Sequence, residues 1–279
     1  MTYPGTWLYA PGDRPDRMAK ALATGAETVV FDLQDAVADA HKHDARRAVV
    51  EFMGDLDPDD RERPRVHVRI NDIRTDLGQA DLDAVAALPA LGGIRLPRVE
   101  SADDVRLAVG IADRYRTDVG FHCLIETAAG VENSFRIATA PQVAAISLGE
   151  GDLRVELRLI DETAFDWVRS RIVVAAAAAQ LPPPGMAVYG NVKDHAGLKV
   201  SCERGRRLGM HGRSAIHPAQ LPVIAEVFAP TPAEIEHARR IVSAAQDRSG
   251  GFALPDGTFI DQPVVTAARR TLTRAANGR

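Results

Sequence analysis

Short apolar runs alternate with longer mixed segments along most of the chain. Each run has the length of a buried strand, and each is followed by a spacer long enough for a helix. The predicted strands cover residues 6–10, 28–33, 65–70, 93–97, 119–125, 143–148, 186–189 and 212–216. Strands that alternate with helices form parallel sheets, and eight such units are typical of a TIM barrel. We therefore predict an α/β fold, a (β/α)8 TIM barrel.

The spacers carry helical periodicity. In residues 101–112, apolar side chains recur at Val105, Leu107, Ala108 and Ile111, a near-helical spacing that indicates a helix. Ser101 precedes this pattern and is suited to cap the helix, since a serine hydroxyl accepts a hydrogen bond from the first turn. This segment is predicted to be the helix between the fourth and fifth strands.

A different pattern follows the eighth predicted strand. Residues 232–248 are predicted to form a helix, and residues 250–261 a hairpin, because Asp256–Gly257 lies between two short apolar runs. A last helix is expected over residues 263–276. We predict a barrel domain over residues 1–230 and a C-terminal extension of hairpin and helices over residues 231–279. This extension is expected to pack on its own barrel or on a neighbouring subunit.

Composition narrows the class of protein further. The chain has 279 residues, of which 46% are hydrophobic, and a formal net charge of −4. Binding to nucleic acid or to an anionic membrane relies on clustered basic residues, so neither partner is expected. The longest apolar run, residues 172–179, is shorter than the about 18 residues of a membrane helix. Two distant cysteines and the absence of a signal-peptide pattern favour a cytoplasmic protein.

Polar residues interrupt the apolar pattern at the carboxyl ends of the predicted strands, where TIM barrels place their active sites. Glu126 follows the fifth strand and Asp152 follows the sixth. Two such carboxylates can share Mg2+, which takes oxygen ligands from one or two carboxylates together with substrate and water. The other candidates are Asp13, Arg14, Gln34, Asp35, Arg69, Asn71, Arg98 and Glu100.

Arginines in this set favour an acidic substrate, because guanidinium groups bind carboxylates and phosphates through two hydrogen bonds. Arg14 is a candidate for contact with a phosphate. Each residue also has a structural alternative: Asp35 could cap a helix, and Arg69 could form an ordinary ion pair. His217 precedes Pro218 and is predicted to be a turn residue without a catalytic role.

The sequence lacks the parts of a nucleophilic enzyme. It contains no Gly-x-Ser-x-Gly motif, and neither cysteine has a recognisable reactive setting. All four lysines fall in predicted helices or loops, which argues against a Schiff-base mechanism. Metal-assisted chemistry on a small oxyacid therefore accounts best for these residues.

Seven short motifs occur in the order in which a known family has them. They are Tyr9-Ala10-Pro11-Gly12-Asp13-Arg14-Pro15, Phe31-Asp32-Leu33-Gln34-Asp35-Ala36-Val37, Val68-Arg69-Ile70-Asn71, Leu96-Pro97-Arg98-Val99-Glu100, Ile125-Glu126-Thr127, Gly149-Glu150-Gly151-Asp152-Leu153 and Ile216-His217-Pro218. Together they resemble the HpcH/HpaI aldolase and citrate lyase beta-subunit family, in particular the branch of malyl-CoA and citramalyl-CoA lyases.

The resemblance implies a Mg2+-dependent barrel, trimeric or hexameric, that makes or breaks a carbon–carbon bond between an acyl-CoA thioester and a 2-oxoacid. Glu126 and Asp152 match the metal carboxylates of the family, and Arg69 matches the arginine at the substrate oxyanion. Asp261 resembles an acid that a neighbouring subunit supplies. The substrate-binding set is Arg69, Gly149, Gly151, Asp35 and Arg14, with backbone amides near Gly149 and Gly151 placed to hold a carboxylate.

Four departures from the family pattern stand near these motifs. Gln34 replaces an acid beside Asp35, and Gly151 occupies the position before Asp152 where the family has an acid, so that the acid is shifted to Glu150. Met186 and Asn191 replace two further aspartates around the seventh strand. They bring the usual substrate of the family into question.

Three functions remain open from the sequence. The first is a lyase that cleaves or forms a malyl-, citramalyl- or citryl-CoA type of thioester. The second is a thioesterase that uses the same metal and Arg69 while Asp261 activates water. The third is a citrate-lyase-like subunit without catalysis, which Gln34, Met186 and Asn191 would favour and which the retained Glu126 and Asp152 weigh against.

Overall fold

The computed structural model describes residues 5–115, 119–246, 250–254 and 257–277. The chain divides into two compact units. Of the described residues, 5–227 form the sheet unit and those from Phe228 onward form the tail unit. Within the described ranges, no helix is long and apolar enough to cross a membrane.

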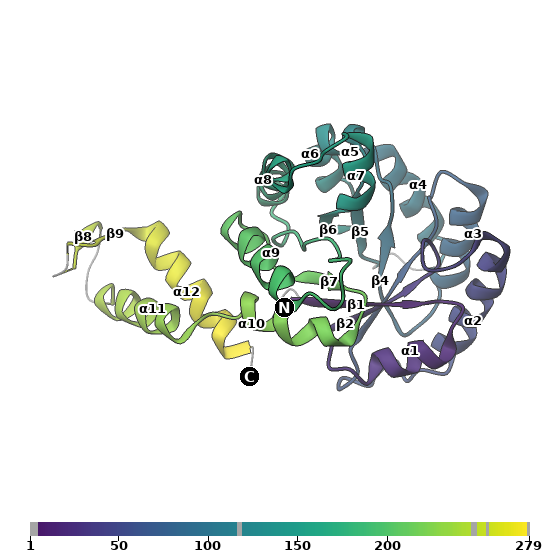
Figure 1. Ribbon diagram of the computed structural model, residues 1–279, viewed down its shortest axis with the longest axis horizontal. Helices are drawn as coiled ribbons and strands as arrows, with labels where there is room; N and C mark the ends of the chain where they lie inside the picture. Colours follow the sequence, from purple (N-terminus) through teal and green to yellow (C-terminus); the bar gives the residue numbers. More distant parts are fainter. Residues whose placement is uncertain (1–4, 116–118, 247–249, 255–256, 278–279) are drawn as a thin grey trace. The chain divides into compact units, whose positions relative to one another are not determined.

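The sheet unit is built around a curled, seven-stranded parallel sheet (Figure 1). Its strands run in the order β6-β5-β4-β3-β2-β1-β7, and every neighbouring pair is parallel. The strands are β1 (Thr6–Pro11), β2 (Thr28–Asp32), β3 (Arg65–Arg69), β4 (Leu91–Leu96), β5 (Phe121–Ile125), β6 (Val143–Leu148) and β7 (Arg213–Ala215). The predicted α/β class is confirmed, and seven of the eight predicted strands are present.

The predicted strand at residues 186–189 forms a single parallel bridge, between Met186 and Arg213. The Met186 N–H donates to the Gly212 carbonyl at 3.0 Å, and the Ser214 N–H donates to the Met186 carbonyl at 3.1 Å. The ladder stops there because Arg213 Nε takes the next carbonyl, that of Ala187, at 2.8 Å. The seven strands and the segment at Met186 thus follow barrel order, and among the described residues no ladder joins β6 to the Met186 segment.

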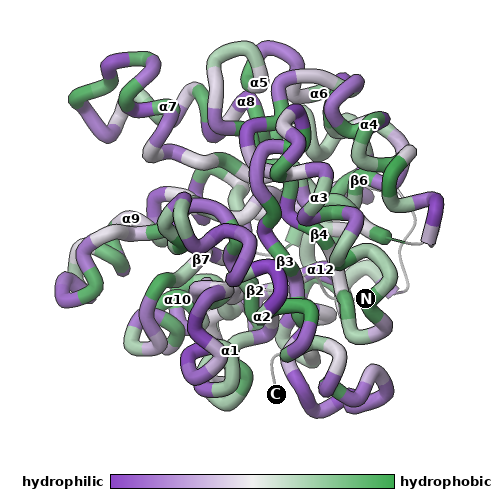
Figure 2. The backbone as a smooth tube through the Cα atoms, turned by 90° about the vertical axis from the view of Figure 1, so that its right-hand side faces the viewer, coloured by the Kyte–Doolittle hydropathy of each residue, from purple (hydrophilic) through white to green (hydrophobic). Residues whose placement is uncertain are grey.

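Helices follow the strands and cover the outside of the sheet (Figure 1). They are α1 (Pro15–Leu22), α2 (Lys42–Gly54), α3 (Asp76–Val85), α4 (Ala102–Ala112), α5 (Ala128–Glu132), α6 (Ser134–Ala138), α7 (Glu150–Glu156), α8 (Phe165–Ala178), α9 (His195–Arg207) and α10 (Leu221–Phe228), with short 3-10 turns η1 (Asp39–His41), η2 (Glu162–Ala164) and η3 (Pro218–Gln220). Apolar and polar stretches mix along these helices (Figure 2), as expected of elements with one face on a core.

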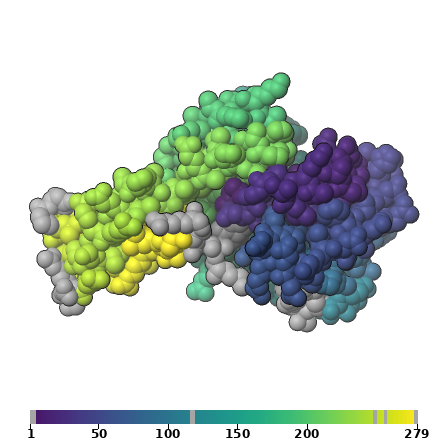
Figure 3. Space-filling model, turned by 90° about the horizontal axis from the view of Figure 1, so that it is seen from below, coloured from purple at the N-terminus to yellow at the C-terminus, as the bar shows by residue number. Residues whose placement is uncertain are grey.

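The spacer helix predicted over residues 101–112 is confirmed as α4. Ser101 and Asp104 form a capping box, in which the Ser101 hydroxyl accepts from the Asp104 N–H and the Asp104 carboxylate accepts from the Ser101 N–H. Of the four apolar residues in the pattern, Val105, Ala108 and Ile111 are buried, whereas Leu107 is exposed. Successive helices α1 to α4 also contact one another, so the first third of the chain forms one continuous surface in the space-filling view (Figure 3).

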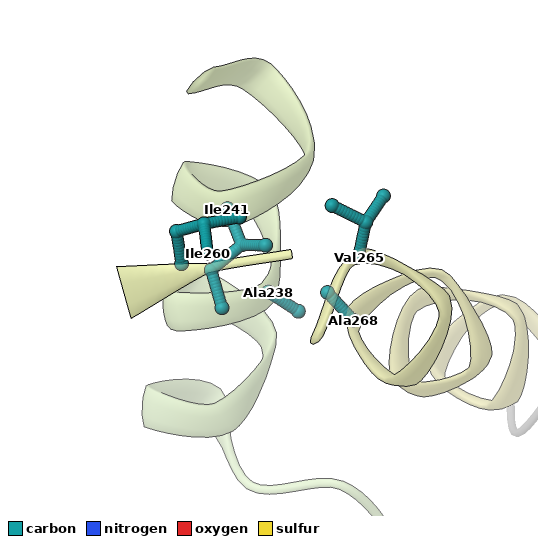
Figure 4. Close-up of a cluster of buried hydrophobic side chains, with 5 residues drawn as sticks. All are labelled: Ala238, Ile241, Ile260, Val265 and Ala268. Atoms are coloured by element: carbon teal, nitrogen blue, oxygen red, sulfur yellow. The ribbon is translucent and has the colours of Figure 1, made fainter. Parts of the chain in front are cut away.

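The tail unit has its own small core. Helices α11 (Pro232–Ala244) and α12 (Gln262–Asn277) flank a two-stranded antiparallel hairpin, β8 (Phe252–Ala253) and β9 (Phe259–Ile260). Figure 4 shows the buried cluster that joins them, formed by Ala238, Ile241, Ile260, Val265 and Ala268. The predicted hairpin between two helices is therefore present. Asp256, and residues 247–248 of the predicted first helix, lie outside the described residues.

Candidate active site

The carboxyl ends of the central strands bring most of the predicted polar residues together. Asp32 ends β2 and pairs in register with Arg69, which ends β3. Glu126 directly follows β5, and Gly149 directly follows β6. Because these strands are parallel neighbours, their ends form one edge of the sheet unit, as a barrel-type active site requires.

Arg69 is held by two carboxylates. Its Nε donates to Asp32 Oδ1 at 2.8 Å and its Nη2 to Asp32 Oδ2 at 2.6 Å, while Nη1 donates to Asp35 at 3.0 Å. Burial alone would lower the pKa of Arg69, but the hydrogen bonds and charge of Asp32 dominate and raise it. The guanidinium also lies 4.9 Å from the centre of the Tyr9 ring. Arg69 is therefore a fixed, permanent cation.

Glu126 is a nearly buried carboxylate, with 5% of its surface exposed. Its Oε2 accepts one hydrogen bond, from the backbone N–H of Arg98 at 2.9 Å. Burial raises the pKa of Glu126 to about 7, although the positive charge of Arg69 opposes the shift. The charge of nearby Asp152 raises the pKa further. A metal cation bound beside Glu126 would offset both the cost of burying its charge and the repulsion from Asp152.

Gly149 allows Glu126 to lie against the start of α7. A side-chain carbon built at Gly149 would come within 2.3 Å of Glu126 Oε1, far inside van der Waals contact. Asp152 belongs to the first turn of the same helix and is about half exposed. The missing side chain at position 149 thus brings the helix that carries Asp152 close to the Glu126 carboxylate.

Arg98 connects the two predicted metal ligands. Its backbone N–H binds Glu126, and its Nη1 lies 3.8 Å from Asp152 Oδ2. To direct the N–H in this way, Arg98 adopts a left-handed backbone conformation with φ of 53°. Non-glycine residues pay for this conformation in free energy, and such strain is typical of functional sites.

These residues fit a hard divalent cation. Within the ranges that the structure covers, no cluster of three or more His, Cys, Asp or Glu side chains could hold a metal by itself. Mg2+ does not require one, since it commonly binds one or two carboxylates and completes its shell with water and substrate oxygens. Glu126 offers a buried carboxylate that forms no side-chain ion pair with Lys or Arg in the described part of the chain, and Asp152 offers an accessible carboxylate.

The other predicted site residues are distributed less tightly. Asp35 reaches Arg69 and is exposed. Gly151 is exposed, with open space around its α-carbon. Arg14 is paired with Asp16 at the start of α1. Asp261 belongs to the tail unit, where its carboxylate accepts from the Val264 N–H at 3.2 Å and so caps α12.

Three of the four departures have definite surroundings. The backbone carbonyl of Gln34 accepts from the side chain of buried Lys42, and the backbone N–H of Gln34 donates to Asp32 at 2.9 Å. Met186 is buried, with its sulfur against Gly205. Asn191 is exposed and forms a local turn with Lys193. Replacement of an acid at these positions therefore removes charge from the neighbourhood without opening the core.

His217 has the structural role that its Pro218 neighbour suggested. Its Nδ1 accepts from the Ala219 N–H at 3.2 Å, and its own N–H donates to Gln220. The two residues form the cap of the 3-10 turn η3.

Sequence reasoning missed two residues that shape the site. Asp32 is almost fully buried and grips Arg69, but in the sequence it is one acid at the end of an apolar run. Tyr9 lies beneath Arg69 and also accepts a hydrogen bond from Arg95 at 3.0 Å. An acid at the end of a fully buried strand was the available signal for Asp32, since a buried charge needs a partner.

A curled parallel sheet with a buried carboxylate, an accessible carboxylate and a clamped arginine at its strand ends has the arrangement of an α/β barrel-type active site. The family model for HpcH/HpaI aldolase/citrate lyase matches residues 6–218. The chain belongs to this family.

Relatives and solved structures agree with this assignment. The chain is 35% identical to a (3S)-malyl-CoA thioesterase of Cereibacter sphaeroides, over 96% of this chain and 93% of the relative. It is 36% identical to a citrate lyase subunit beta-like protein of Mycobacterium tuberculosis, over 96% and 94% of the two chains. The crystal structure of protein CitE from M. tuberculosis in complex with magnesium, acetoacetate and coenzyme A is similar, with a TM-score of 0.82, 32% identity and 98% of each chain covered.

Proposed function

We propose that this protein is a Mg2+-dependent carbon–carbon lyase that acts on a 3-hydroxyacyl-CoA of the malyl, citramalyl or citryl type, giving an acyl-CoA and a 2-oxoacid, or catalyses the reverse reaction. The observation that carries the proposal is the buried Glu126 carboxylate, which lies beside Asp152 and the fixed cation Arg69. The complexes of the similar CitE structure with magnesium and coenzyme A support the choice of metal and substrate class.

In this proposal Glu126 and Asp152 hold Mg2+. Bound there, Mg2+ would act as a Lewis acid toward the oxygen on the carbon next to the substrate carboxylate. The backbone N–H of Gly151, in the first turn of α7, would orient that carboxylate. The Gly149 N–H cannot share this role, because it donates to the Ile125 carbonyl at 3.0 Å. The absence of a side chain at Gly149 leaves room for the Glu126 carboxylate itself.

Arg69 stabilises the charge that develops during cleavage. In the cleavage direction Asp261 would accept the proton of the substrate hydroxyl as the carbon–carbon bond breaks. The electron pair of that bond moves into the thioester, which becomes an enolate. A preorganised guanidinium lowers the energy of this enolate without rearrangement. The two carboxylates Asp32 and Asp35 hold Arg69 ready for this role.

Asp261 is proposed to return a proton to the acyl carbon, which completes the acyl-CoA product. Because Asp261 belongs to the tail unit, this role requires the tail of one chain to reach an active site. We propose that a neighbouring chain in a homotrimer or hexamer provides Asp261. We also propose that the sheet closes into a full (β/α)8 barrel. The proposed location of the protein is the cytoplasm. Arg14 is proposed to contact a phosphate of coenzyme A.

Hydrolysis of a malyl-CoA thioester is a second candidate. The similarity to a (3S)-malyl-CoA thioesterase over almost the whole chain favours it. The same metal and Arg69 would serve, with Asp261 activating water instead of protonating carbon. The two reactions differ in their products, since hydrolysis releases free CoA and an intact hydroxyacid.

Product analysis by mass spectrometry tests both candidates. Purified protein with Mg2+ is incubated with malyl-, citramalyl- and citryl-CoA, with and without EDTA. Acyl-CoA together with a 2-oxoacid, lost on addition of EDTA, supports the lyase. Free CoA with an intact hydroxyacid establishes the thioesterase. Absence of turnover with every substrate, in protein that also binds no Mg2+, contradicts both.

A further inference from the structure

The buried ion pair between Arg169 of α8 and Glu150 of α7 has no role in the chemistry described above. Arg169 Nε donates to Glu150 Oε1 at 2.7 Å, and Nη2 donates to Glu150 Oε2 at 2.7 Å. The Arg169 side chain is completely buried, and that of Glu150 is 12% exposed. Such a two-point contact fixes orientation as well as distance.

Arg169 is anchored in the body of the sheet unit. Its helix packs against β6 and α6. Two further carboxylates neutralise it: Glu162 Oε1 at 2.5 Å and Asp166 at 3.6 Å. The guanidinium also lies 5.6 Å from the centre of the Phe165 ring. Arg169 is therefore a fixed side chain that holds the first turn of α7 in place through Glu150.

The position of Glu150 decides the direction of Asp152. Residues two apart on a helix point to roughly opposite sides, because each residue turns the chain by about 100°. With Glu150 bound to α8, Asp152 points away from α8, and its carboxylate lies 3.8 Å from Arg98, whose N–H binds Glu126. The far end of α7 is held too, since Glu156 accepts from the Ala128 N–H at 3.2 Å.

We propose that Arg169 is a positioning residue for the metal site: through Glu150 it orients α7 so that Asp152 and Glu126 can bind one Mg2+ together. This inference rests on the proposed function, because it takes these two carboxylates as the metal ligands. The inference also assigns a role to Glu150, the acid that stands one position away from its place in the family pattern. Glu150 is engaged by Arg169 and serves the site through the backbone, not as a ligand.

Calorimetric titration with Mg2+ at pH 8 tests the proposal on Glu150→Gln, which leaves Arg169 neutralised by Glu162 and Asp166. Changes to groups that orient metal ligands typically weaken metal affinity by about 10- to 100-fold. We expect a loss of about tenfold, equivalent to about 1.4 kcal/mol. Saturating Mg2+ should restore kcat, since Asp152 itself is intact. Arg169→Lys keeps the positive charge but cannot form the two parallel hydrogen bonds. Its Mg2+ affinity should lie between the affinities of Glu150→Gln and Arg169→Met.

Arg204→Gln is the matched control. Arg204 forms an equally close two-point pair with Asp166 in the same network, at 2.8 and 2.6 Å, without touching α7. Its Mg2+ affinity should equal that of the wild type. If folded Glu150→Gln binds Mg2+ as tightly as the wild type while Asp152→Asn does not bind, the positioning role is wrong and the metal site stands. If the wild type itself binds no Mg2+, the metal site is wrong and the inference falls with it.

Discussion

Arg69 and Asp32 face each other at neighbouring strand ends as a fork-to-fork ion pair, in which the carboxylate is 1% exposed. A pair this deeply buried constrains how Arg69 can be altered. The two partners were taken out of water together, so removing one leaves the other as an uncompensated charge.

Arg69→Ala should therefore lose stability as well as activity. We expect the free energy of unfolding to fall by about 3 to 5 kcal/mol, because Asp32 is left buried and unpaired. Arg69→Lys keeps a positive charge and should lose much less stability, but it cannot reproduce the two parallel hydrogen bonds. Urea denaturation of both variants measures the difference. Equal stability of the two variants would contradict the ion-pair account.

Gly149 and Gly151 should respond in opposite directions to alanine. Gly149→Ala places a carbon within 2.3 Å of Glu126 Oε1, so we expect weaker Mg2+ binding and a lower Tm. Gly151→Ala points into open space on an exposed helix and should raise stability by up to about 1 kcal/mol. Thermal unfolding and Mg2+ titration of the pair provide the comparison. Normal Mg2+ affinity in Gly149→Ala would show that the close approach is not required.

The metal-free protein should lose stability as pH rises through the titration of Glu126. Its pKa is raised from 4.5 to about 7 by burial, so the folded state holds this proton more tightly than the unfolded state. The stabilising contribution is complete below about pH 4.5 and is lost by the time pH exceeds about 7. Glu126→Gln removes this dependence.

Denaturation in EDTA at pH 5 and pH 8 checks this expectation. The gain in stability of Glu126→Gln over the wild type should be larger at pH 8, by an amount on the order of 3 kcal/mol. Saturating Mg2+ at pH 8 should reduce the gap, since the metal binds only the wild-type carboxylate. A gap that does not depend on pH would mean that Glu126 titrates normally.

Asp261 can be tested by complementation between chains. Asp261→Ala and Asp152→Asn should each be inactive and folded, because neither side chain is part of a buried core. In mixed oligomers, some sites would combine an intact metal site from one chain with an intact Asp261 from another. We expect partial recovery of activity on mixing. Verified mixed oligomers without activity would indicate that Asp261 serves its own chain or has only its capping role.

Most strands and the capped helix α4 could be predicted because their signals are local. A buried parallel strand is a short apolar run, and the Ser101–Asp104 box lies within four residues. The strand near Met186 could not be judged in this way. Its ladder ends because the Arg213 side chain takes a backbone carbonyl 26 residues away in sequence, a contact with no local signature.

The proximity of the predicted site residues could be anticipated from the sequence, whereas their roles stay predictions. Strand-end positions identified Arg69, Glu126 and Asp152, because parallel topology brings those ends together. The partners that orient them were missed. Glu150 was assessed as a displaced acid, since nothing near it in sequence reveals Arg169, and Asp32 was hidden in an apolar run. Pairings between distant elements depend on tertiary structure, which periodicity does not encode.

The left-handed backbone at Arg98 has a consequence for efforts to make this protein more robust. A glycine at that position would adopt φ of 53° without steric cost, so a screen for thermal stability should favour Arg98→Gly. The same exchange would remove the guanidinium beside Asp152. A more stable protein obtained by this exchange would therefore lack the cation that now links the two candidate metal ligands.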